Sequence, residues 1–248
     1  MARGGNSRKA TVKRGGTPSR SDTAPSSLPA VLFDLDGTLI DSVYQHTLAW
    51  FRALASAGIV LPVWKIHRRI GMSGSSFLRE LLREVDPDRH LTRKQFDRLD
   101  EQHTAEFAGA RVEVLSGSCE LLNHLEKKNI LWAIATTGGK EQTKRLIELL
   151  PLPEHVPVVT GDDIRRAKPS PDAFVEAARR LRVPIEDCIA IGDSVWDLLA
   201  AGRKSALGVG VLTGGYSRDE LERAGAFRVY CDPADLLAHI EDLGLPGE

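Results

Sequence analysis

Short runs of apolar residues recur along the chain and alternate with stretches in which apolar residues return every three or four positions. The runs are nearly continuous and rich in β-branched and aliphatic residues, a pattern typical of strands that are buried on both faces. They lie at 30–35, 130–135, 156–160, 188–191, 207–212 and 227–230. Between them, helical patterns lie at 118–128, 140–150, 171–181, 195–203 and 218–223. This alternation predicts an α/β fold, with a parallel sheet and helices on both of its faces.

One long interval interrupts the alternation. About ninety residues separate the first two apolar runs, far more than a single crossover helix needs. The interval has no convincing strand pattern, but it has helical patterns at 44–57, 64–70, 76–84 and 93–107. We therefore expect a core formed by 29–43 and 113–248, and an inserted helical cap domain at 44–112. Because ligands of open parallel sheets bind at the carboxyl ends of the strands, where the insertion begins, we interpret it as a lid.

The first 28 residues differ in composition from the rest of the chain. They carry six Lys or Arg residues against a single Asp, in a background of Gly, Ser, Thr and Pro. A segment with so few apolar residues cannot bury a core, and we expect a disordered basic tail at 1–28. A nucleic-acid or membrane-surface tether and an organelle transit peptide are alternative functions. We favour a solvated tail or a misplaced start codon, because the segment has no aromatic residue to stack on bases and no amphipathic stripe.

Length and composition indicate a soluble globular protein. Of 248 residues, 42% are hydrophobic and 27% are charged, and the net charge is −1, so the chain can bury a full core. No apolar run approaches the roughly 20 residues that cross a bilayer, and the amino end lacks the apolar centre of a secretory signal. We therefore predict a cytoplasmic protein without a membrane partner. The three cysteines lack CxxC spacing, and we expect them to be buried, reduced thiols.

The sequence DLDGTL at 34–39 is the most informative motif. Its two carboxylates, Asp34 and Asp36, follow the first predicted strand and are two residues apart. Residues at this spacing share one face of an extended chain, so both acids can point toward one small volume at the carboxyl end of the strand. One acid can then attack an electrophile while its neighbour moves a proton.

Polar residues also follow the next three predicted strands. The second strand ends in Thr136 and Thr137 before two glycines, where hydroxyls and backbone N–H groups can hold an anion. The third is followed by Lys168 in a Lys-Pro-Ser-Pro turn just before a helix, and its fixed ammonium can offset phosphate charge. The fourth leads into Asp193 and, one helical turn later, Asp197, whose hard oxygen atoms suit Mg²⁺.

Taken together, the four strand ends resemble the haloacid dehalogenase superfamily. Its four motifs match DLDGTL, Thr136, Lys168 and the GDxxxD pattern at 192–197 in order and spacing. The helical insertion resembles the α-helical cap of the phosphoglycolate phosphatase and β-phosphoglucomutase branch, and the resemblance covers nearly all of 30–232. It implies a Rossmann-like catalytic core beneath the cap and Mg²⁺ as the cofactor.

The resemblance implies a role for each acid of the first motif. Asp34 is expected to be the nucleophile that forms an aspartyl-phosphate, which splits ester hydrolysis into two displacements. Asp36 is expected to protonate the leaving alcohol and then to activate water. Their environments must separate their pKa values, because two carboxylates in one small pocket cannot be equally basic. The acid at position 36 also distinguishes this chain from the dehalogenase branch, which has no alkoxide to protonate.

The resemblance also implies the metal and phosphate ligands. The expected Mg²⁺ ligands are Asp34, the backbone carbonyl of Asp36, and Asp193. The transferring phosphoryl oxygens are expected to be bound by Thr136, Thr137 and Lys168. Asp197 is expected to lie behind these ligands and to orient Lys168 or a water at the metal.

Two residues of the insertion are candidate substrate contacts. His46 matches by position the cap His of β-phosphoglucomutase, which senses bound sugar phosphate and helps to position the general acid. Arg68 falls near the mutase Arg that grips the non-transferring phosphate. The structural alternative for His46 and Trp50, four residues apart, is a packed interface within the cap. The alternative for Arg68 is a solvated charge.

The predicted function is that of a Mg²⁺-dependent phosphatase for a small phosphorylated metabolite, either a sugar phosphate or a phosphoglycolate-like acid. The cap is expected to exclude bulk water during phosphoryl transfer. A phosphosugar mutase of the β-phosphoglucomutase type is one alternative, because it shares the first half-reaction. A non-catalytic binding module tethered by the basic tail is another, and the intact acids of every motif argue against it. Apart from that tail, nothing in the sequence favours nucleic acid as a partner.

Overall fold

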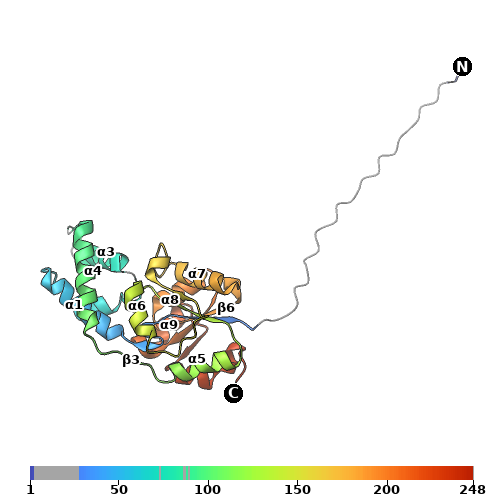
Figure 1. Cartoon of the computed structure of the whole chain (residues 1–248). Helices are drawn as coiled ribbons and strands as arrows, with labels where there is room; N and C mark the ends of the chain where they lie inside the picture. Colours follow the sequence, from blue (N-terminus) through green and yellow to red (C-terminus); the bar gives the residue numbers. More distant parts are fainter. Residues whose placement is uncertain (3–27, 73, 86–87, 89, 248) are drawn as a thin grey trace.

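The structure is a computed structural model that describes residues 1–2, 28–72, 74–85, 88 and 90–247. The tail predicted at 1–28 therefore lies almost wholly outside the described residues. The described chain forms an α/β core with a group of helices at one end (Figure 1). Within the described ranges, none of the helices combines the length and the apolar character needed to span a bilayer.

A six-stranded sheet with the strand order β5-β4-β1-β6-β7-β8 forms the centre of the core. Every neighbouring pair of strands in it is parallel, as the alternating pattern predicts. Each strand coincides with one of the six apolar runs. The strands are β1 (Ala30–Phe33), β4 (Trp132–Ala135), β5 (Val158–Val159), β6 (Cys188–Gly192), β7 (Leu207–Val211) and β8 (Arg228–Tyr230).

Helices cover both faces of this sheet. They are α5 (Ser118–Lys127), α6 (Lys140–Ile147), α7 (Asp172–Leu181), α8 (Val195–Gly202), α9 (Arg218–Arg223) and α10 (Pro233–Ala238). In β1, Val31 and Phe33 pack in one cluster with α5 and α10, whereas Ala30 and Leu32 pack in another with α7 and α8. Because successive side chains point to opposite faces, such a strand needs apolar residues at every position. The predicted fold class is confirmed, and only α10, which is six residues long, lacks a predicted counterpart.

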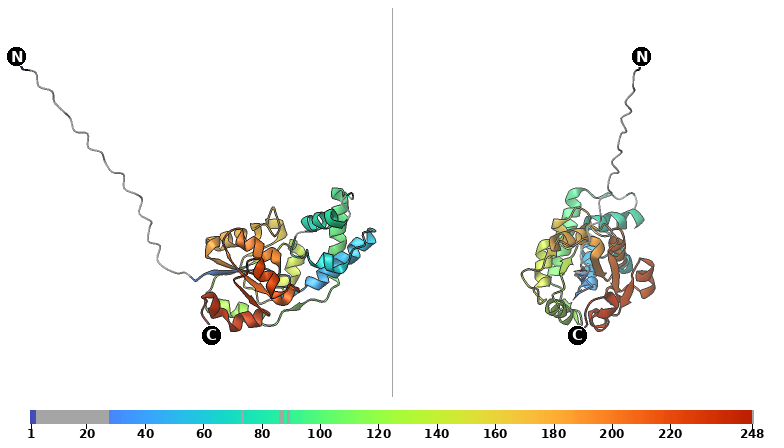
Figure 2. Two further views of the ribbon diagram at one scale, coloured as in Figure 1. Left: turned by 180° about the vertical axis from the view of Figure 1, so that it is seen from behind. Right: turned by 90° about the vertical axis from the view of Figure 1, so that its right-hand side faces the viewer.

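Four helices make up the insertion between β1 and β4. They are α1 (Val43–Ser56), α2 (Val63–His67), α3 (Gly74–Val85) and α4 (Arg93–Ala108). They share an apolar cluster that is separate from the clusters of the core and includes Trp50, Leu54, Phe77 and Leu99. Figures 1 and 2 show these helices together beyond one end of the sheet. We call residues 43–108 the cap.

Two short strands join the cap to the core. β2 (Ile40–Asp41) pairs antiparallel with β3 (Glu113–Val114), with Ile40 opposite Val114. β3 corrects the expectation that this interval contains no strand, which failed because two residues are too few to show a period. The pairing brings the two ends of the cap together beside the first motif, so the cap lies over the carboxyl end of β1.

The three cysteines are free, but they are not equally buried. Cys188 is buried in β6, Cys119 is partly buried, and Cys231 is exposed. The prediction of three buried thiols is therefore wrong for Cys231, because β8 ends at Tyr230 and the chain leaves the sheet there.

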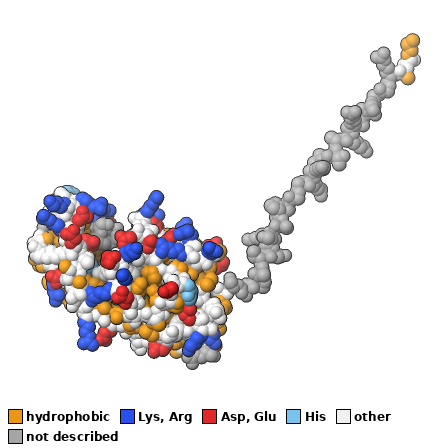
Figure 3. Space-filling model, in the orientation of Figure 1, with side chains coloured by type: hydrophobic (Ala, Val, Ile, Leu, Met, Phe, Trp, Pro, Cys, Tyr) orange, Lys and Arg blue, Asp and Glu red, His pale blue; other side chains and the backbone are white. Residues whose placement is uncertain are grey.

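Charges of both signs are intermingled on the surface. In Figure 3, Lys and Arg side chains lie among Asp and Glu side chains over both the cap and the core. Several form ion pairs, such as Arg93 with Asp97 and Arg180 with Asp163. Exposed pairs of this kind contribute only about 0–1 kcal/mol each to stability. This face shows no continuous basic surface of the type that binds a nucleic-acid backbone.

Candidate active site

The site is built where β1 ends. The strand stops at Phe33, and Asp34 and Asp36 follow it directly. The chain then turns at Gly37, whose φ of +82° is a conformation that residues with a Cβ rarely adopt. A Cβ at this position would also lie 2.7 Å from the Asp193 carboxyl group. Gly37 therefore both turns the chain and leaves room for Asp193 beside the first motif.

Lys168 is buried and binds two of the acids. Its ammonium group forms an ion pair with Asp34, in which it also donates a hydrogen bond, and a second ion pair with Asp197 at 2.7 Å. Only 1% of the residue is exposed. Burial alone would lower the pKa of Lys168, but Asp197 and Asp34 raise it above its ordinary value. The ammonium therefore stays charged, and the turn before α7 delivers a cation to the end of β1.

Three carboxylates lie close enough to share a cation. Oxygen atoms of Asp34, Asp193 and Asp197 lie within 4.8 Å of one another, and all three residues are buried. Burial is the main reason that the pKa of Asp34 rises to about 7; Lys168 lowers it, and repulsion from Asp197 and Asp36 raises it further. Burial likewise raises the pKa of Asp193, followed by repulsion from Asp197 and Asp34. Buried oxygen donors that repel one another in this way fit Mg²⁺, whose charge would offset their repulsion.

Asp193 and Asp197 are held rigidly in this cluster. The Thr38 hydroxyl donates a hydrogen bond to Asp193 Oδ1 at 3.2 Å. A Cβ on Gly214, in the turn after β7, would lie 1.7 Å from Asp193 Oδ2, so only glycine leaves space for the carboxylate. The N–H and hydroxyl groups of Ser194 donate to Asp197 Oδ2 at 3.2 and 2.5 Å. The other oxygen of Asp197 contacts Lys168, so Asp197 is placed to orient that ammonium.

Asp36 has different surroundings from Asp34. Its Oδ1 accepts a hydrogen bond from the Ser42 hydroxyl at 2.6 Å and lies 3.1 Å from His46 Nε2. Burial alone would raise the pKa of Asp36, but His46 and the Ser42 hydrogen bond bring it below its ordinary value. The surroundings therefore separate the pKa values of the two acids. Beside Ser42 and His46, the Asp36 side chain is therefore an ionised carboxylate, the form that can accept a proton.

The two threonines lie on the same side of the site. Thr136 follows β4 and is buried, and its hydroxyl oxygen accepts a hydrogen bond from the Gly138 N–H at 3.1 Å. The Thr137 hydroxyl donates to the Gly71 carbonyl of the cap at 3.2 Å. Both residues line the same cavity as the first motif. Thr137 thus also ties the core to the cap, a contact that nothing in the sequence indicates.

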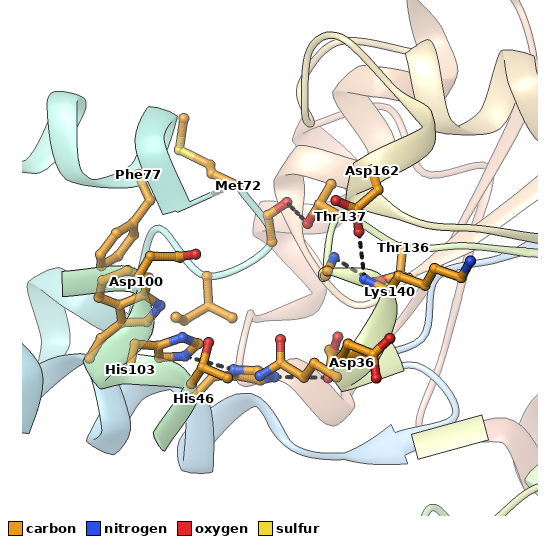
Figure 4. A pocket seen from close by; sticks show the side chains of 18 of the residues that line it. Asp36, His46, Met72, Phe77, Asp100, His103, Thr136, Thr137, Lys140 and Asp162 are labelled. Carbon is orange, nitrogen blue, oxygen red and sulfur yellow. Dashed lines mark hydrogen bonds and ion pairs between the residues drawn. The ribbon is translucent and has the colours of Figure 1, made fainter. Parts of the chain in front are cut away.

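A cavity of about 490 Å³ lies between the core and the cap, a volume typical of small-molecule sites. Figure 4 shows its two sides. On the core side lie Asp36, Thr136 and Thr137, and on the cap side lie His46, Met72, Phe77, Asp100 and His103. The candidate reacting groups of the core therefore face a space that the cap covers.

His46 links the cap to Asp36. Its Nδ1 lies 3.1 Å from His103 Nε2, and its ring stacks on that of Phe107 with 3.8 Å between the ring centroids. The packed interface and the contact with the general-acid candidate are thus both present. Burial, followed by the charge of His46, lowers the pKa of His103 to about 3, so His103 is neutral. The sequence did not predict a role for His103, because its contact with His46 forms only when α4 packs against α1.

Arg68 does not face the cavity. Its guanidinium group forms an ion pair with Glu220 of α9 and lies 4.0 Å from the centre of the Tyr216 ring. Its backbone carbonyl accepts hydrogen bonds from the Tyr216 hydroxyl at 2.8 Å and the Trp196 indole at 3.2 Å. This placement supports neither a grip on a substrate phosphate nor a solvated charge. Arg68 instead fastens the cap to the core, through partners that are distant in the sequence.

Comparison with known proteins identifies relatives along most of the chain. The family of haloacid dehalogenase-like hydrolases matches residues 28–203, and a second, HAD-hydrolase-like family matches residues 165–243. The chain is 32% identical to hexitol phosphatase A of Escherichia coli over 177 residues, which cover 69% of this chain and 78% of that protein. It is 29% identical to a phosphoglycolate phosphatase of Rhodospirillum rubrum over 216 residues, which cover 84% of this chain and 88% of that protein.

A solved structure agrees with these relatives. A crystal structure of a hydrolase from Pseudomonas syringae matches with a TM-score of 0.83 and 46% sequence identity, over 87% of this chain and 99% of that one. The family match at 28–203 contains all four motifs, and the relatives named above are phosphatases. The resemblance inferred from the motifs is thereby confirmed. The chain belongs to the haloacid dehalogenase-like hydrolases and is an enzyme of their phosphatase branch.

Proposed function

We propose that this enzyme is a Mg²⁺-dependent cytoplasmic phosphatase that hydrolyses a small phosphorylated metabolite through an aspartyl-phosphate. The metabolite is a sugar phosphate or a phosphoglycolate-like acid. One observation carries the proposal: Asp34, Lys168 and Asp193 come from three different strand ends and meet beside a cavity that the cap covers. Two relatives, named for a hexitol and for phosphoglycolate, support the substrate class.

The reaction divides into two displacements. Asp34 attacks the phosphorus atom, and the bond between phosphorus and the alcohol oxygen breaks. Lys168 and the Thr136 hydroxyl bind the phosphoryl oxygens, whose charge increases in the transition state. Asp36, which is ionised beside His46, must first take up a proton from the solvent or the ester as the substrate binds. It gives this proton to the departing alkoxide and regains one from the water that cleaves the aspartyl-phosphate, so its proton is restored for the next cycle.

The contact between Asp36 and His46 couples proton transfer to the cap. Ser42 and His46 hold the Asp36 carboxyl group in one orientation, which serves both half-reactions. His46 lies on α1 of the cap, so this contact exists only while the cap lies over the core. Proton transfer is thereby limited to the closed state, in which bulk water is excluded.

The metal would be held by carboxylates that the core already brings together. Asp34 and Asp193, with the backbone carbonyl of Asp36, are the proposed ligands, and Asp197 lies beside them. When bound, Mg²⁺ supplies positive charge that lets an anionic carboxylate approach an anionic ester.

A panel of phosphate monoesters, assayed with Mg²⁺ and with EDTA, tests this proposal. We expect phosphate release from at least one sugar phosphate or phospho-acid with Mg²⁺, and its loss with EDTA. Rapid acid quenching followed by peptide mass spectrometry should find the phosphoryl group on Asp34. An active enzyme with a phosphoryl group on another residue would contradict the mechanism, and inactivity toward the whole panel would contradict the function.

The hydrogen bond between His46 and Asp36 also favours a second candidate, a phosphosugar mutase, because the resemblance to β-phosphoglucomutase includes this His. In a mutase, a second sugar hydroxyl receives the phosphoryl group in place of water. Incubation with β-glucose 1-phosphate and a bisphosphate primer separates the two, since a mutase forms glucose 6-phosphate and a phosphatase releases free phosphate. The position of Arg68 outside the cavity favours the phosphatase. The non-catalytic alternative has no support, because the chain belongs to a hydrolase family.

A further inference from the structure

One part of the cap side of the cavity is apolar. The rings of Trp50 and Phe77 lie 4.8 Å apart between centroids, and Ile70 and Met72 line the same side. Side chains of this kind contact the carbon skeleton of a ligand and offer nothing to a charge. The leaving group of the substrate must therefore present carbon surface to the cap.

One carboxylate interrupts this apolar wall. Asp100 projects from α4 and lies beside Phe77 in Figure 4, across the cavity from Asp36. No hydrogen bond or ion pair joins its side chain to another described residue. Asp100 is solvent-exposed at the edge of the cavity. Partial loss of solvent at the wall still raises the pKa of its carboxyl group, and repulsion from Asp97 and Glu101 adds to this. A carboxylate in this setting accepts hydrogen bonds from hydroxyl groups and repels a second anion.

The core side of the cavity offers a donor without a partner. The Nε2 atom of Gln142 is buried and has no hydrogen-bond partner among the residues that the structure describes, and Gln142 lines the cavity. A buried donor of this kind is unfavourable unless a ligand accepts from it. The cavity thus has a free acceptor at Asp100 and a free donor at Gln142. A hydroxyl group, which both donates and accepts, can satisfy either one.

Among the residues that the structure describes, Lys140 is the one Lys or Arg residue that lines the cavity. Arg68 is held by Glu220 outside the cavity. Lys140 is exposed, and Figure 4 shows its side chain directed away from the cap. Lys168 lies at the opposite end of the site, in ion pairs with Asp34 and Asp197. The segment 73–76 is Ser-Gly-Ser-Ser in the sequence and adds no basic residue.

Three arginines lie near the site but do not line its cavity. Arg79, Arg93 and Arg165 line a neighbouring hollow between the cap and the loop after β5. Asp100 and Asp162 line both this hollow and the cavity. These two carboxylates therefore lie at the boundary between the cavity and the arginines.

We infer that the leaving group is an uncharged polyhydroxylated alcohol and that Asp100 excludes esters with a second anionic group. This inference rests on the proposed phosphatase function and narrows it. Phosphates of sugars and polyols are substrates, whereas phospho-acids and bisphosphates are rejected. The transferring phosphoryl group meets Lys168, but a second anion in the cavity would meet Asp100 without a counter-charge.

A matched pair of substrates tests this inference. Glucose 6-phosphate and 6-phosphogluconate have the same number of carbon atoms and the same phosphate position, but only the second carries a carboxylate. We expect kcat/KM with Mg²⁺ to be about tenfold higher for glucose 6-phosphate, since one like-charge contact at a solvent-accessible protein surface has this magnitude. Sorbitol 6-phosphate should behave like glucose 6-phosphate, and phosphoglycolate like 6-phosphogluconate. p-Nitrophenyl phosphate reports whether the enzyme hydrolyses any phosphate ester.

The variant Asp100→Lys examines the role of the carboxylate directly. We expect it to shift the kcat/KM ratio of the matched pair toward 6-phosphogluconate by about tenfold or more. Asp97→Lys is the matched control, because Asp97 lies one turn away on α4, is paired with Arg93 and does not line the cavity. The control should leave the ratio within about twofold of wild type. Thermal unfolding of both variants checks that each is folded.

The outcomes separate the inference from the proposed function. If no ester, including p-nitrophenyl phosphate, is hydrolysed with Mg²⁺, the function fails and the inference fails with it. If p-nitrophenyl phosphate is hydrolysed but 6-phosphogluconate is as good a substrate as glucose 6-phosphate, the function stands and the inference is overturned. An equal shift in the Asp100→Lys and Asp97→Lys variants would overturn the role of Asp100.

Discussion

The strand ends of the core and the wall of the cap hold their polar groups in different ways. In the core, each reacting side chain has fixed partners: Lys168 binds two carboxylates, and Asp193 lies in a cradle that a Cβ would fill. On the cap, Asp100 projects from a helix without a partner among the described residues. Under the proposed function, the core is organised for one constant group, the phosphoryl group, and the cap for a leaving group that can vary. This difference assigns the chemistry to the core and the selectivity to the cap.

Several polar contacts join the two regions, in addition to those of Arg68. His67 Nε2 lies 2.9 Å from the Gly214 carbonyl, beside the cradle of Asp193. Thr137 reaches the cap at Gly71, and His46 reaches the core at Asp36. Contacts of this kind are individually weak, which suits a cap that must open to release product. Several of them use residues next to the reacting groups, so closure also completes the site.

Removing the proposed nucleophile should have the largest effect, and it tests whether the chemistry belongs to the core. Asp34→Asn keeps the size of the side chain, but an amide cannot form the acyl phosphate, so we expect kcat to fall by at least about 10⁴-fold. Phosphate release measures this. The control is Asp41→Asn, since Asp41 is acidic, near in sequence and exposed. Turnover by Asp34→Asn at the wild-type rate would remove Asp34 from the mechanism.

Changing the cap residue that touches the core should have an intermediate effect. His46→Gln weakens the hold on Asp36, so we expect kcat to fall by about 10- to 100-fold, with a smaller change in KM. His155→Gln is the control, because the His155 side chain is 70% exposed. If KM rises and kcat stays unchanged, His46 binds substrate and takes no part in proton transfer.

The acid cluster should make Mg²⁺ binding and stability depend on pH. The pKa of Asp34 is about 7 in the folded protein against an ordinary 3.8, so between these values the folded state binds more protons than the unfolded state. The free energy of unfolding without metal therefore falls as pH rises through this window. Mg²⁺ needs the ionised carboxylate, so it should raise the melting temperature more at about pH 8 than at about pH 5.

Differential scanning fluorimetry with and without Mg²⁺ measures this increment. Asp193→Asn provides the comparison, because it removes one proposed ligand and should reduce the increment at both pH values. Equal increments in wild type at both pH values would show that proton release from the cluster is not linked to metal binding.

Loosening the attachment of the cap should have the smallest effect. Glu220→Gln removes the charge that pairs with Arg68, and both side chains are about one third exposed, at 33% and 37%. Exposed pairs of this kind contribute about 0–1 kcal/mol, so we expect a change of no more than about threefold in KM and little change in kcat. Glu222→Gln, an exposed change on the same helix, is the control. A large loss of kcat would mean that this ion pair limits closure of the cap.

The sequence pattern was sufficient to predict the structure where a local rule applied. Continuous apolar runs indicated strands buried on both faces, and residues such as Val31 and Leu32 do pack against opposite helix layers. The candidate site followed from the rule that parallel strands end at one edge, which the ion pair between Asp34 and Lys168 bears out. The rule did not extend to β3 or Cys231, because a strand of two residues and a single thiol carry no periodic signal.

The residues of the cap show the opposite case. Helical spacing placed His46 and Arg68 on helices but could not say what faced them. His103 meets His46 only because α1 packs against α4, and Arg68 turns outward only because Glu220 and Tyr216 lie there. These contacts join positions 57 and 152 residues apart, and no local pattern encodes such a pairing.

The amino-acid sequence alone determined the parallel α/β core, the presence of a helical insertion and the polar groups at four strand ends. Backbone periodicity and the direction of parallel strands are local properties, so they can be read from short segments. Only the tertiary structure decided which side chains of the cap face the cavity and that Arg68 is turned away from it. It also decided that the side chains of Asp100 and Gln142 have no polar partner within the described parts of the chain. Those features depend on how separate helices pack, and side-chain packing is a property of the whole folded chain.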